Sequence, residues 1–179
     1  MVNFTRAAAA LALAATASAA PASTAVKATE TTSDLTWTVS NFDFHADYIF
    51  TTPAHQNSWG YVNFALSSDK TDLVYSCSTA SSRLMDFFYG ETEYACAAPA
   101  GAPEGSKAGF RYNRTDGTLT LSETVVGEET YTVSGSTKIE TTCTDVTTGP
   151  SPDWTVGQIY TWRKVDCDEV NATVAGTVA

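Results

Sequence analysis

The chain of 179 residues lacks the short motifs that mark many catalytic and phosphate-binding sites. It has no Gly-x-Ser-x-Gly turn for a nucleophilic serine and no glycine-rich loop that would cradle a phosphate. It has only two histidines, neither near a cysteine, and no Cys-x-x-Cys pair, so no zinc site is expected. We predict no metal, no cofactor and no turnover. A hydrolase that uses two of the 20 acidic residues stays open as an alternative.

One histidine has acidic neighbours. In an extended chain, Asp43, His45 and Asp47 would share a face, and this combination is able to hold a divalent metal. Phe44 interrupts the polar run, however, and we predict that the chain is a long loop as far as Asn57. We therefore favour a solvated loop with an exposed histidine.

Positive charge is scarce, since 10 Lys and Arg stand against 20 Asp and Glu. An acidic surface repels phosphate groups, so nucleic acids and anionic membranes are poor partners. Residues 1–20 combine one basic residue, an Ala- and Leu-rich run and a small-residue cleavage site at Ala17-Ser18-Ala19, which is typical of a signal peptide. No later run is apolar enough to cross a bilayer. We therefore expect a soluble protein that is secreted to the extracellular space, with no membrane partner.

Four cysteines in an exported chain form an even set that predicts two disulfides. Three pairings are possible. We favour Cys77–Cys96 with Cys143–Cys167, because each of these pairs closes a short loop. In the chain-entropy model a loop of that length contributes about 3 kcal/mol.

The clearest local pattern is a hairpin over Gly109–Glu123, because Asp116-Gly117 is a strong signal for a two-residue type I′ turn. This turn would pair Thr115 with Thr118 and Tyr112 with Leu121. One face then carries the apolar side chains Phe110, Tyr112, Leu119 and Leu121, and the other face is polar.

Similar alternation recurs along the chain and predicts about eight to eleven short strands with no long helix. We therefore predict an all-β protein, a single compact barrel or sandwich of antiparallel strands over residues 34–167. Residues 21–33 are rich in Ala, Thr and Ser and are predicted to be a flexible lead-in. Residues 168–179 are small and polar and are predicted to be a flexible tail.

Four Trp and eight Tyr make the domain rich in aromatic rings. Tyr48, Trp59 and Trp154 lie in or beside predicted loops, where they would be able to stack on a sugar or a flavonoid. Ordinary core and rim packing is the alternative, and we favour it. Asn113 and Asn171 head Asn-x-Thr sequences and are predicted N-glycosylation sites.

Several landmarks together resemble the Alternaria major allergen family, the AA1-like domain proteins of filamentous fungi. The similarity runs from about Leu35 to Cys143, and it depends on the order in which the motifs occur along the chain. The motifs are Trp37-Thr38-Val39-Ser40-Asn41-Phe42, Val62-Asn63-Phe64, Tyr75-Ser76-Cys77-Ser78, Tyr94-Ala95-Cys96 and Phe110-Arg111-Tyr112.

The resemblance implies a secreted β-barrel with two disulfides that acts as an allergen, effector or elicitor of plant defence. It also implies a host extracellular defence protein or a small flavonoid-type aromatic ligand as the partner, and no catalytic residues. This chain lacks the N-terminal cysteine that links two subunits in the allergen, so a monomer or non-covalent dimer is expected. The polar residues after Cys167 predict that the last strand of the family is missing.

We expect the partner to meet loops at one end of the barrel, around Tyr48 to Trp59 and Ala97 to Lys107. The alternatives to a host-binding effector are a lipocalin-like carrier of a small apolar ligand and the carboxylate-dependent hydrolase.

Overall fold

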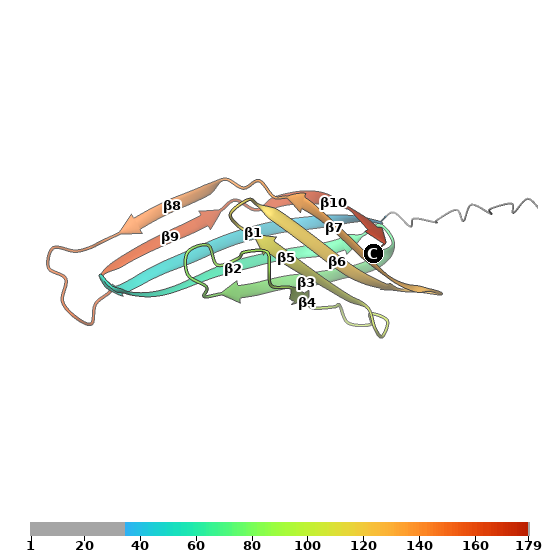
Figure 1. Cartoon of the computed structure of the whole chain (residues 1–179), viewed down its shortest axis with the longest axis horizontal. Coiled ribbons are helices and arrows are strands. Elements are labelled where there is room, and N and C mark those ends of the chain that lie inside the picture. The colour runs from blue at the N-terminus through green and yellow to red at the C-terminus, as the bar shows by residue number, and fades with distance from the viewer. Residues whose placement is uncertain (1–34, 179) are drawn as a thin grey trace, which may run out of the picture. The chain divides into compact units, whose positions relative to one another are not determined.

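The computed structural model describes residues 35–178, and this part of the chain is built from ten β-strands without a helix (Figure 1). The all-β prediction and the predicted number of strands are therefore confirmed. The predicted signal peptide (1–20) and lead-in (21–33) lie outside the described residues. The strands are β1 (Leu35–Thr52), β2 (His55–Ser68), β3 (Thr71–Ser81), β4 (Tyr94–Cys96), β5 (Lys107–Asn113), β6 (Thr118–Val126), β7 (Thr130–Lys138), β8 (Cys143–Thr148), β9 (Thr161–Cys167) and β10 (Val170–Val178).

Eight strands form a nearly closed antiparallel barrel in the order β3-β2-β1-β10-β7-β6-β5-β4. Its two end strands meet at one bridge, where the amides and carbonyls of Ser76 and Ala97 exchange hydrogen bonds of 2.9 and 2.8 Å. The Cys77–Cys96 disulfide crosses the same seam between β3 and β4. This bridge joins the two end strands at one point, so part of the edge of β3 still has no neighbouring strand.

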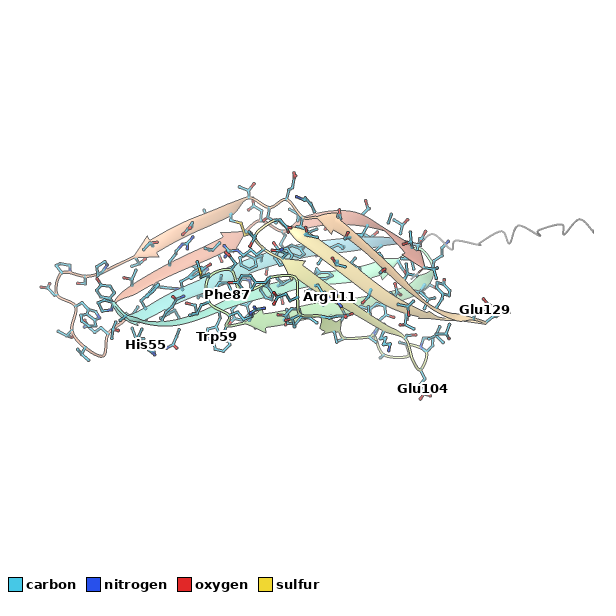
Figure 2. All side chains as sticks on the ribbon, in the orientation of Figure 1. His55, Trp59, Phe87, Glu104, Arg111 and Glu129 are labelled. Carbon is cyan, nitrogen blue, oxygen red and sulfur yellow. A yellow bond between two sulfur atoms is a disulfide. The ribbon has the colours of Figure 1, made fainter. Side chains whose placement is uncertain are left out.

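Beyond the barrel, the β1–β2 hairpin continues as a sheet extension to which β9 and β8 add on the other side of β1. The Cys143–Cys167 disulfide ties β8 to β9 within this extension. Both predicted pairings are therefore confirmed. Figure 2 places His55, at the tip of the β1–β2 hairpin, and Glu129, in the β6–β7 turn, at opposite ends of the barrel and its extension.

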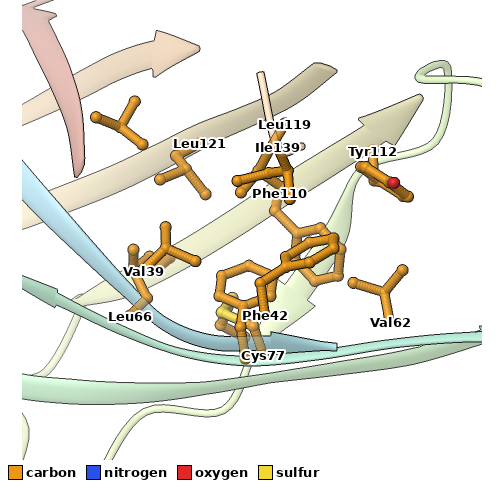
Figure 3. Packing of buried hydrophobic residues seen from close by; sticks show 14 of the residues in the cluster. Val39, Phe42, Val62, Leu66, Cys77, Phe110, Tyr112, Leu119, Leu121 and Ile139 are labelled. Atoms are coloured by element: carbon orange, nitrogen blue, oxygen red, sulfur yellow. A yellow bond between two sulfur atoms is a disulfide. The ribbon is translucent and has the colours of Figure 1, made fainter. Parts of the chain in front are cut away.

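The alternation of side chains explains the barrel interior. In β6 every second residue is buried, so its apolar residues face inward while Thr and Ser face out. The core is rich in aromatic rings. Phe42 packs edge-on against Tyr112 at 5.1 Å (Figure 3), and Phe64 packs edge-on against Phe110 at 4.9 Å. Such pairs stabilise a core beyond the area that they bury.

The central hairpin has the predicted faces but not the predicted turn. Asn113 pairs with Thr118, so the turn has four residues and the register is shifted by two. A shift of two keeps each side chain on its face, and Phe110, Tyr112, Leu119 and Leu121 are all buried. The Asp116 carboxylate accepts the backbone N–H of Thr118 at 2.9 Å, and Gly117 takes a φ of +73°, which together close the longer turn.

The prediction of a long loop from Phe42 to Asn57 is wrong, because this stretch forms the outer halves of β1 and β2. Phe44, Ala46 and Tyr48 are buried on the inner face of the extension. The polar residues that suggested a loop alternate with them and face outward.

The prediction of a flexible tail after Cys167 is also wrong, because residues 170–178 form strand β10 between β1 and β7. Its small residues are required by close packing: a Cβ on Gly176 would lie 2.5 Å from the ring of Trp37. A larger side chain at Gly176 would therefore collide with the core.

Candidate functional site

The inner face of the sheet extension is the most distinctive surface of the described chain. The segment between β3 and β4 covers part of this face with Phe87, which is fully buried. A Cβ on Gly60 would lie 2.6 Å from the Phe87 ring, so the ring rests directly on the backbone of β2. The Tyr48 ring lies beside it at 5.0 Å.

The covering segment has an unusual backbone. Met85 and Phe87 both have positive φ angles, 76° and 63°, which non-glycine residues rarely adopt. The segment is fixed by two hydrogen bonds: the Tyr48 hydroxyl donates to the Met85 carbonyl at 2.9 Å, and the Ser81 hydroxyl donates to the Phe87 carbonyl at 2.7 Å. Backbone strain of this kind concentrates at functional sites.

Two arginines converge on Tyr48 from different elements. Arg114, in the turn after β5, donates to the Tyr48 hydroxyl at 2.6 Å, and its guanidinium lies 4.5 Å from the Phe44 ring centre. Arg163, on β9, is paired with Tyr48 in the sheet register, and its guanidinium lies 4.8 Å from the Tyr48 ring centre. Cations over aromatic faces are held by the ring quadrupole and by stacking.

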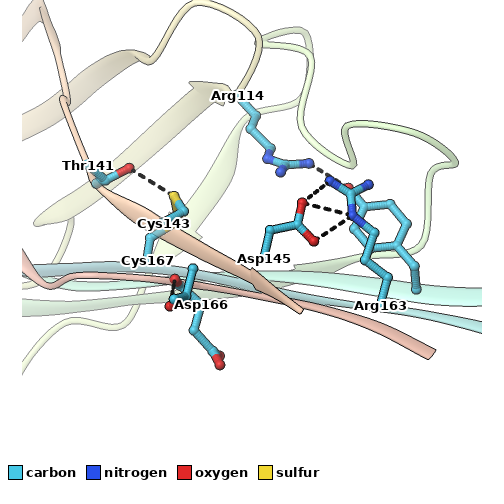
Figure 4. The surroundings of a disulfide bond; sticks show 9 residues. Arg114, Thr141, Cys143, Asp145, Arg163, Asp166 and Cys167 are labelled. Carbon is cyan, nitrogen blue, oxygen red and sulfur yellow. Dashed lines mark hydrogen bonds and ion pairs between the residues drawn. A yellow bond between two sulfur atoms is a disulfide. The ribbon is translucent and has the colours of Figure 1, made fainter. Parts of the chain in front are cut away.

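The two guanidiniums are not equally neutralised. Arg163 donates to both oxygens of the Asp145 carboxylate, with Nε at 2.9 and 3.0 Å (Figure 4). These hydrogen bonds hold the pKa of Asp145 below its usual value and raise the pKa of Arg163. Arg114 has a single, longer ion pair, 3.7 Å from Asp86, and the same Nη1 donates to Tyr48, so the donors on its other nitrogens remain available.

A hollow of about 330 Å³, which we call the arginine hollow, lies over this cluster. It is lined by Tyr48, Gln56, Met85, Asp86, Arg114 and Arg163. Arg114 also borders a second hollow of about 440 Å³ that reaches the Cys143–Cys167 disulfide. The arrangement offers guanidinium donors beside aromatic walls, which suits a planar ligand with anionic or hydroxyl oxygens.

The structure does not bring the three predicted aromatic ligand residues together. Tyr48 lies in the arginine hollow, whereas Trp59 is on the opposite, outer face of the same sheet and is 47% exposed. Trp154 lies in the loop between β8 and β9, where it packs edge-on against Tyr160 at 5.4 Å.

The two predicted partner loops are also separated, because Tyr48–Trp59 belongs to the β1–β2 hairpin and Figure 2 shows Glu104 at the other end. The prediction that they share one end of the barrel is wrong. The sequence does not reveal Arg114 and Arg163 as site residues, since the register of β9 against β1 brings Arg163 to Tyr48 and the β5–β6 turn brings Arg114 to the same ring.

The acidic neighbours of His45 do share a face, on the outside of β1. The imidazole Nδ1 lies 2.9 Å from the Asp43 carboxylate, and the ring stacks on Tyr61 at 4.8 Å. The Asp47 carboxylate instead accepts the indole N–H of Trp162 at 2.8 Å.

The predicted glycosylation sites lie in different settings. Asn113 ends β5, is half-buried and accepts the N–H of Thr115 at 3.0 Å. Asn171 is exposed on β10, and its side-chain carbonyl accepts the N–H of Asn41 at 2.8 Å.

The described residues include no helix that would be able to span a membrane.

Comparison with protein-family models identifies the family of this chain. The model of the family described as Alternaria alternata allergen 1 matches residues 39–167. Two crystal structures of the Alternaria alternata major allergen Alt a 1 were found as structural neighbours. The first is 16% identical to this chain in sequence, the match covers 80% of this chain and 94% of the allergen chain, and the TM-score is 0.45. The second is 17% identical, the match covers 80% of this chain and 88% of the allergen chain, and the TM-score is 0.43. No curated protein sequence matches. The family match runs from β1 to the last cysteine and confirms the resemblance seen in the motifs, so this chain belongs to the Alternaria alternata allergen 1 family.

Proposed function

We propose that the protein is a secreted binding protein that takes a flavonoid-type phenolic ligand in the arginine hollow and catalyses no reaction. The observation that carries the proposal is the convergence of Arg114 and Arg163 on Tyr48 beside a solvent-open volume of about 330 Å³. Secretion is proposed from the N-terminal sequence, which has the composition of a signal peptide.

The chemistry of the hollow fits such a ligand. A flavonol is a planar, polyhydroxylated ring system with acidic hydroxyl groups. Guanidinium groups stack on planar rings and donate to anionic oxygens through a rigid fork. The side chain of Arg114 is only 20% exposed, so a hydrogen bond that it makes to the ligand would be partly shielded from water.

The barrel interior supports a lipocalin-like carrier less well than the rim supports a ligand in the arginine hollow. A carrier of that kind holds its ligand in the middle of the barrel. Here the middle is filled by packed side chains that include Phe42, Phe64, Phe110 and Tyr112 (Figure 3). We therefore propose a ligand at the rim.

The effector role follows as part of the same proposal. A protein that removes phenolic compounds from the extracellular fluid of a plant would act on the host without touching its cells. Binding of a host defence protein, the other partner that the resemblance implies, would use the same exposed rim.

Titration with quercetin, followed by calorimetry, tests the proposal. Hydrogen bonds to charged groups contribute about 1.5–3 kcal/mol, so Arg114→Gln and Arg163→Gln should each weaken binding by about tenfold or more. Arg111→Gln is the matched control, because Arg111 is exposed and paired with Glu93 on the outer face of β5. Failure of quercetin to bind, or equal weakening by all three changes, would contradict the proposal.

A further inference from the structure

The opposite end of the barrel holds a further cavity, which is separate from the arginine hollow and from the hollow beside the Cys143–Cys167 disulfide. The short strand β4 covers only three residues, so the stretch of β3 before the Ser76–Ala97 bridge has no neighbouring strand on that side. The loop between β4 and β5 passes over this gap (Figure 1). Beneath it lies a cavity of about 220 Å³, which we call the seam cavity.

Two buried polar groups line the seam cavity, and neither is fully satisfied by hydrogen bonds within residues 35–178. Glu123 is 2% exposed; its Oε2 accepts the indole N–H of Trp37 at 2.7 Å, but its Oε1 has no hydrogen bond of good geometry, although the hydroxyls of Ser68 and Thr71 lie near the carboxyl group. Tyr75 is 1% exposed, and its hydroxyl likewise has no hydrogen bond of good geometry, with the Ser106 hydroxyl nearby. A buried polar group that lacks a partner costs about 1–3 kcal/mol, so two of them facing one cavity indicate that the cavity takes a polar ligand.

The charge of the residues that line the seam cavity indicates what kind of ligand it binds. The described residues around the seam cavity include the carboxyl groups of Glu123 and Asp72 but no Lys, Arg or His. Leu73, Val125 and Val126, with Pro103 of the covering loop, supply apolar walls, and the hydroxyl residues Thr71, Ser106 and Thr124 complete the lining. A carboxylate and a hydroxyl are acceptors, and an ammonium group supplies three donors and a positive charge.

We propose that the seam cavity binds a small organic amine, whose ammonium group pairs with Glu123 and Tyr75 and whose apolar body, about the size of one ring, fills the space beside Leu73 and Val125. Burial raises the pKa of Glu123 above its usual value, since the Trp37 N–H and the hydroxyls of Ser68 and Thr71 offset only part of the cost of a buried charge. A cation beside the carboxylate stabilises its charged form and so offsets the rest of the cost of burying it.

The experiment uses 2-phenylethylamine as the probe and 2-phenylethanol as its uncharged counterpart, with the full-length secreted protein at pH 8. Calorimetry gives the affinity, and the indole N–H resonance of Trp37 reports binding, because this N–H is bonded to Glu123. We expect saturable binding of the amine, a shift of that resonance, and binding of the alcohol that is at least tenfold weaker.

Three variants complete the test. Glu123→Gln keeps an acceptor for Trp37 and removes the charge, so the amine affinity should fall at least tenfold. Tyr75→Phe removes only the unpaired hydroxyl and should weaken binding a few-fold; it serves as the test if Glu123→Gln does not fold. Glu93→Gln is the control, because this exposed carboxyl pairs with Arg111 outside the seam cavity and should change nothing. No binding of the amine, equal binding of the alcohol, or unchanged affinity in both test variants would overturn the proposal and leave a site for buried water alone.

Discussion

Removal of the Cys77–Cys96 disulfide should destabilise the protein more than removal of Cys143–Cys167, although the chain-entropy model ranks them the other way. The loops span 19 and 24 residues, which corresponds to about 3.2 and 3.4 kcal/mol of loop-closure entropy at 25 °C. On loop-closure entropy alone, removal of Cys143–Cys167 would lower the free energy of unfolding slightly more than removal of Cys77–Cys96.

Burial reverses this order. Cys77 is 1% exposed and Cys96 is 8% exposed, so replacement of both by Ala leaves two sulfur-sized voids that cost about 1 kcal/mol each. Cys143 is exposed and Cys167 is only half-buried at the margin of the core, so the voids that this pair leaves are small beside those of the seam pair. We therefore expect a loss of about 5 kcal/mol for the Cys77→Ala/Cys96→Ala double variant and about 3.4 kcal/mol for Cys143→Ala/Cys167→Ala.

Urea unfolding of the two double variants and the parent protein measures this difference, with the free energy of unfolding extrapolated to water. Amide hydrogen exchange adds a local readout: opening of the seam should speed exchange at Ser76 and Ala97 in the first variant only. Equal losses in the two variants, or a larger loss for Cys143→Ala/Cys167→Ala, would refute the view that the seam disulfide closes the barrel.

Three further changes test other parts of the structure. Glu123→Gln should raise the melting temperature at pH 7 but not near pH 4. The reason is that burial raises the pKa of Glu123 in the folded state, so the stability that the protonated carboxyl contributes is lost as the pH rises through that pKa. An effect of the same size at both pH values in thermal melts would contradict this. Gly176→Val should cost about 3 kcal/mol in urea unfolding, because the new side chain collides with Trp37, and an unchanged midpoint would exclude the packing described. Phe87→Ala should cost about 3–4 kcal/mol and also weaken quercetin binding, since Phe87 supports Tyr48; calorimetry that shows full affinity would separate the covering segment from the site.

The sequence was sufficient for the class of fold, the disulfide pairing and the buried face of the central hairpin. These features depend on alternation within a strand, on an even number of cysteines and on the short loops that the favoured pairing closes, which are local or countable properties. The shift of register by two at Asp116-Gly117 shows the limit of this reasoning. The side chains kept their faces, but the side-chain hydrogen bond from Asp116 favoured a longer turn than the dipeptide suggested.

Strand β10 was missed for a different reason. Its residues are small and polar, which locally indicates a loose tail. The need for small residues comes from Trp37, whose ring lies against Gly176 across more than 130 positions of the chain. Composition alone does not reveal a contact of that kind.

The candidate site was hidden in the same way. Tyr48 was singled out as an aromatic ligand residue, but the chemistry of the arginine hollow depends on Arg114 and Arg163. They come from a turn and from a strand on another element, and only the folded register of β9 against β1 brings Arg163 to Tyr48.

A titration with quercetin followed by two-dimensional NMR tests the proposed site most directly, because it locates binding as well as detecting it. The account predicts saturable shifts concentrated on Tyr48, Gln56, Met85, Arg114 and Arg163, with the seam cavity around Tyr75 unchanged. Shifts centred elsewhere, or none at saturating ligand, would contradict it.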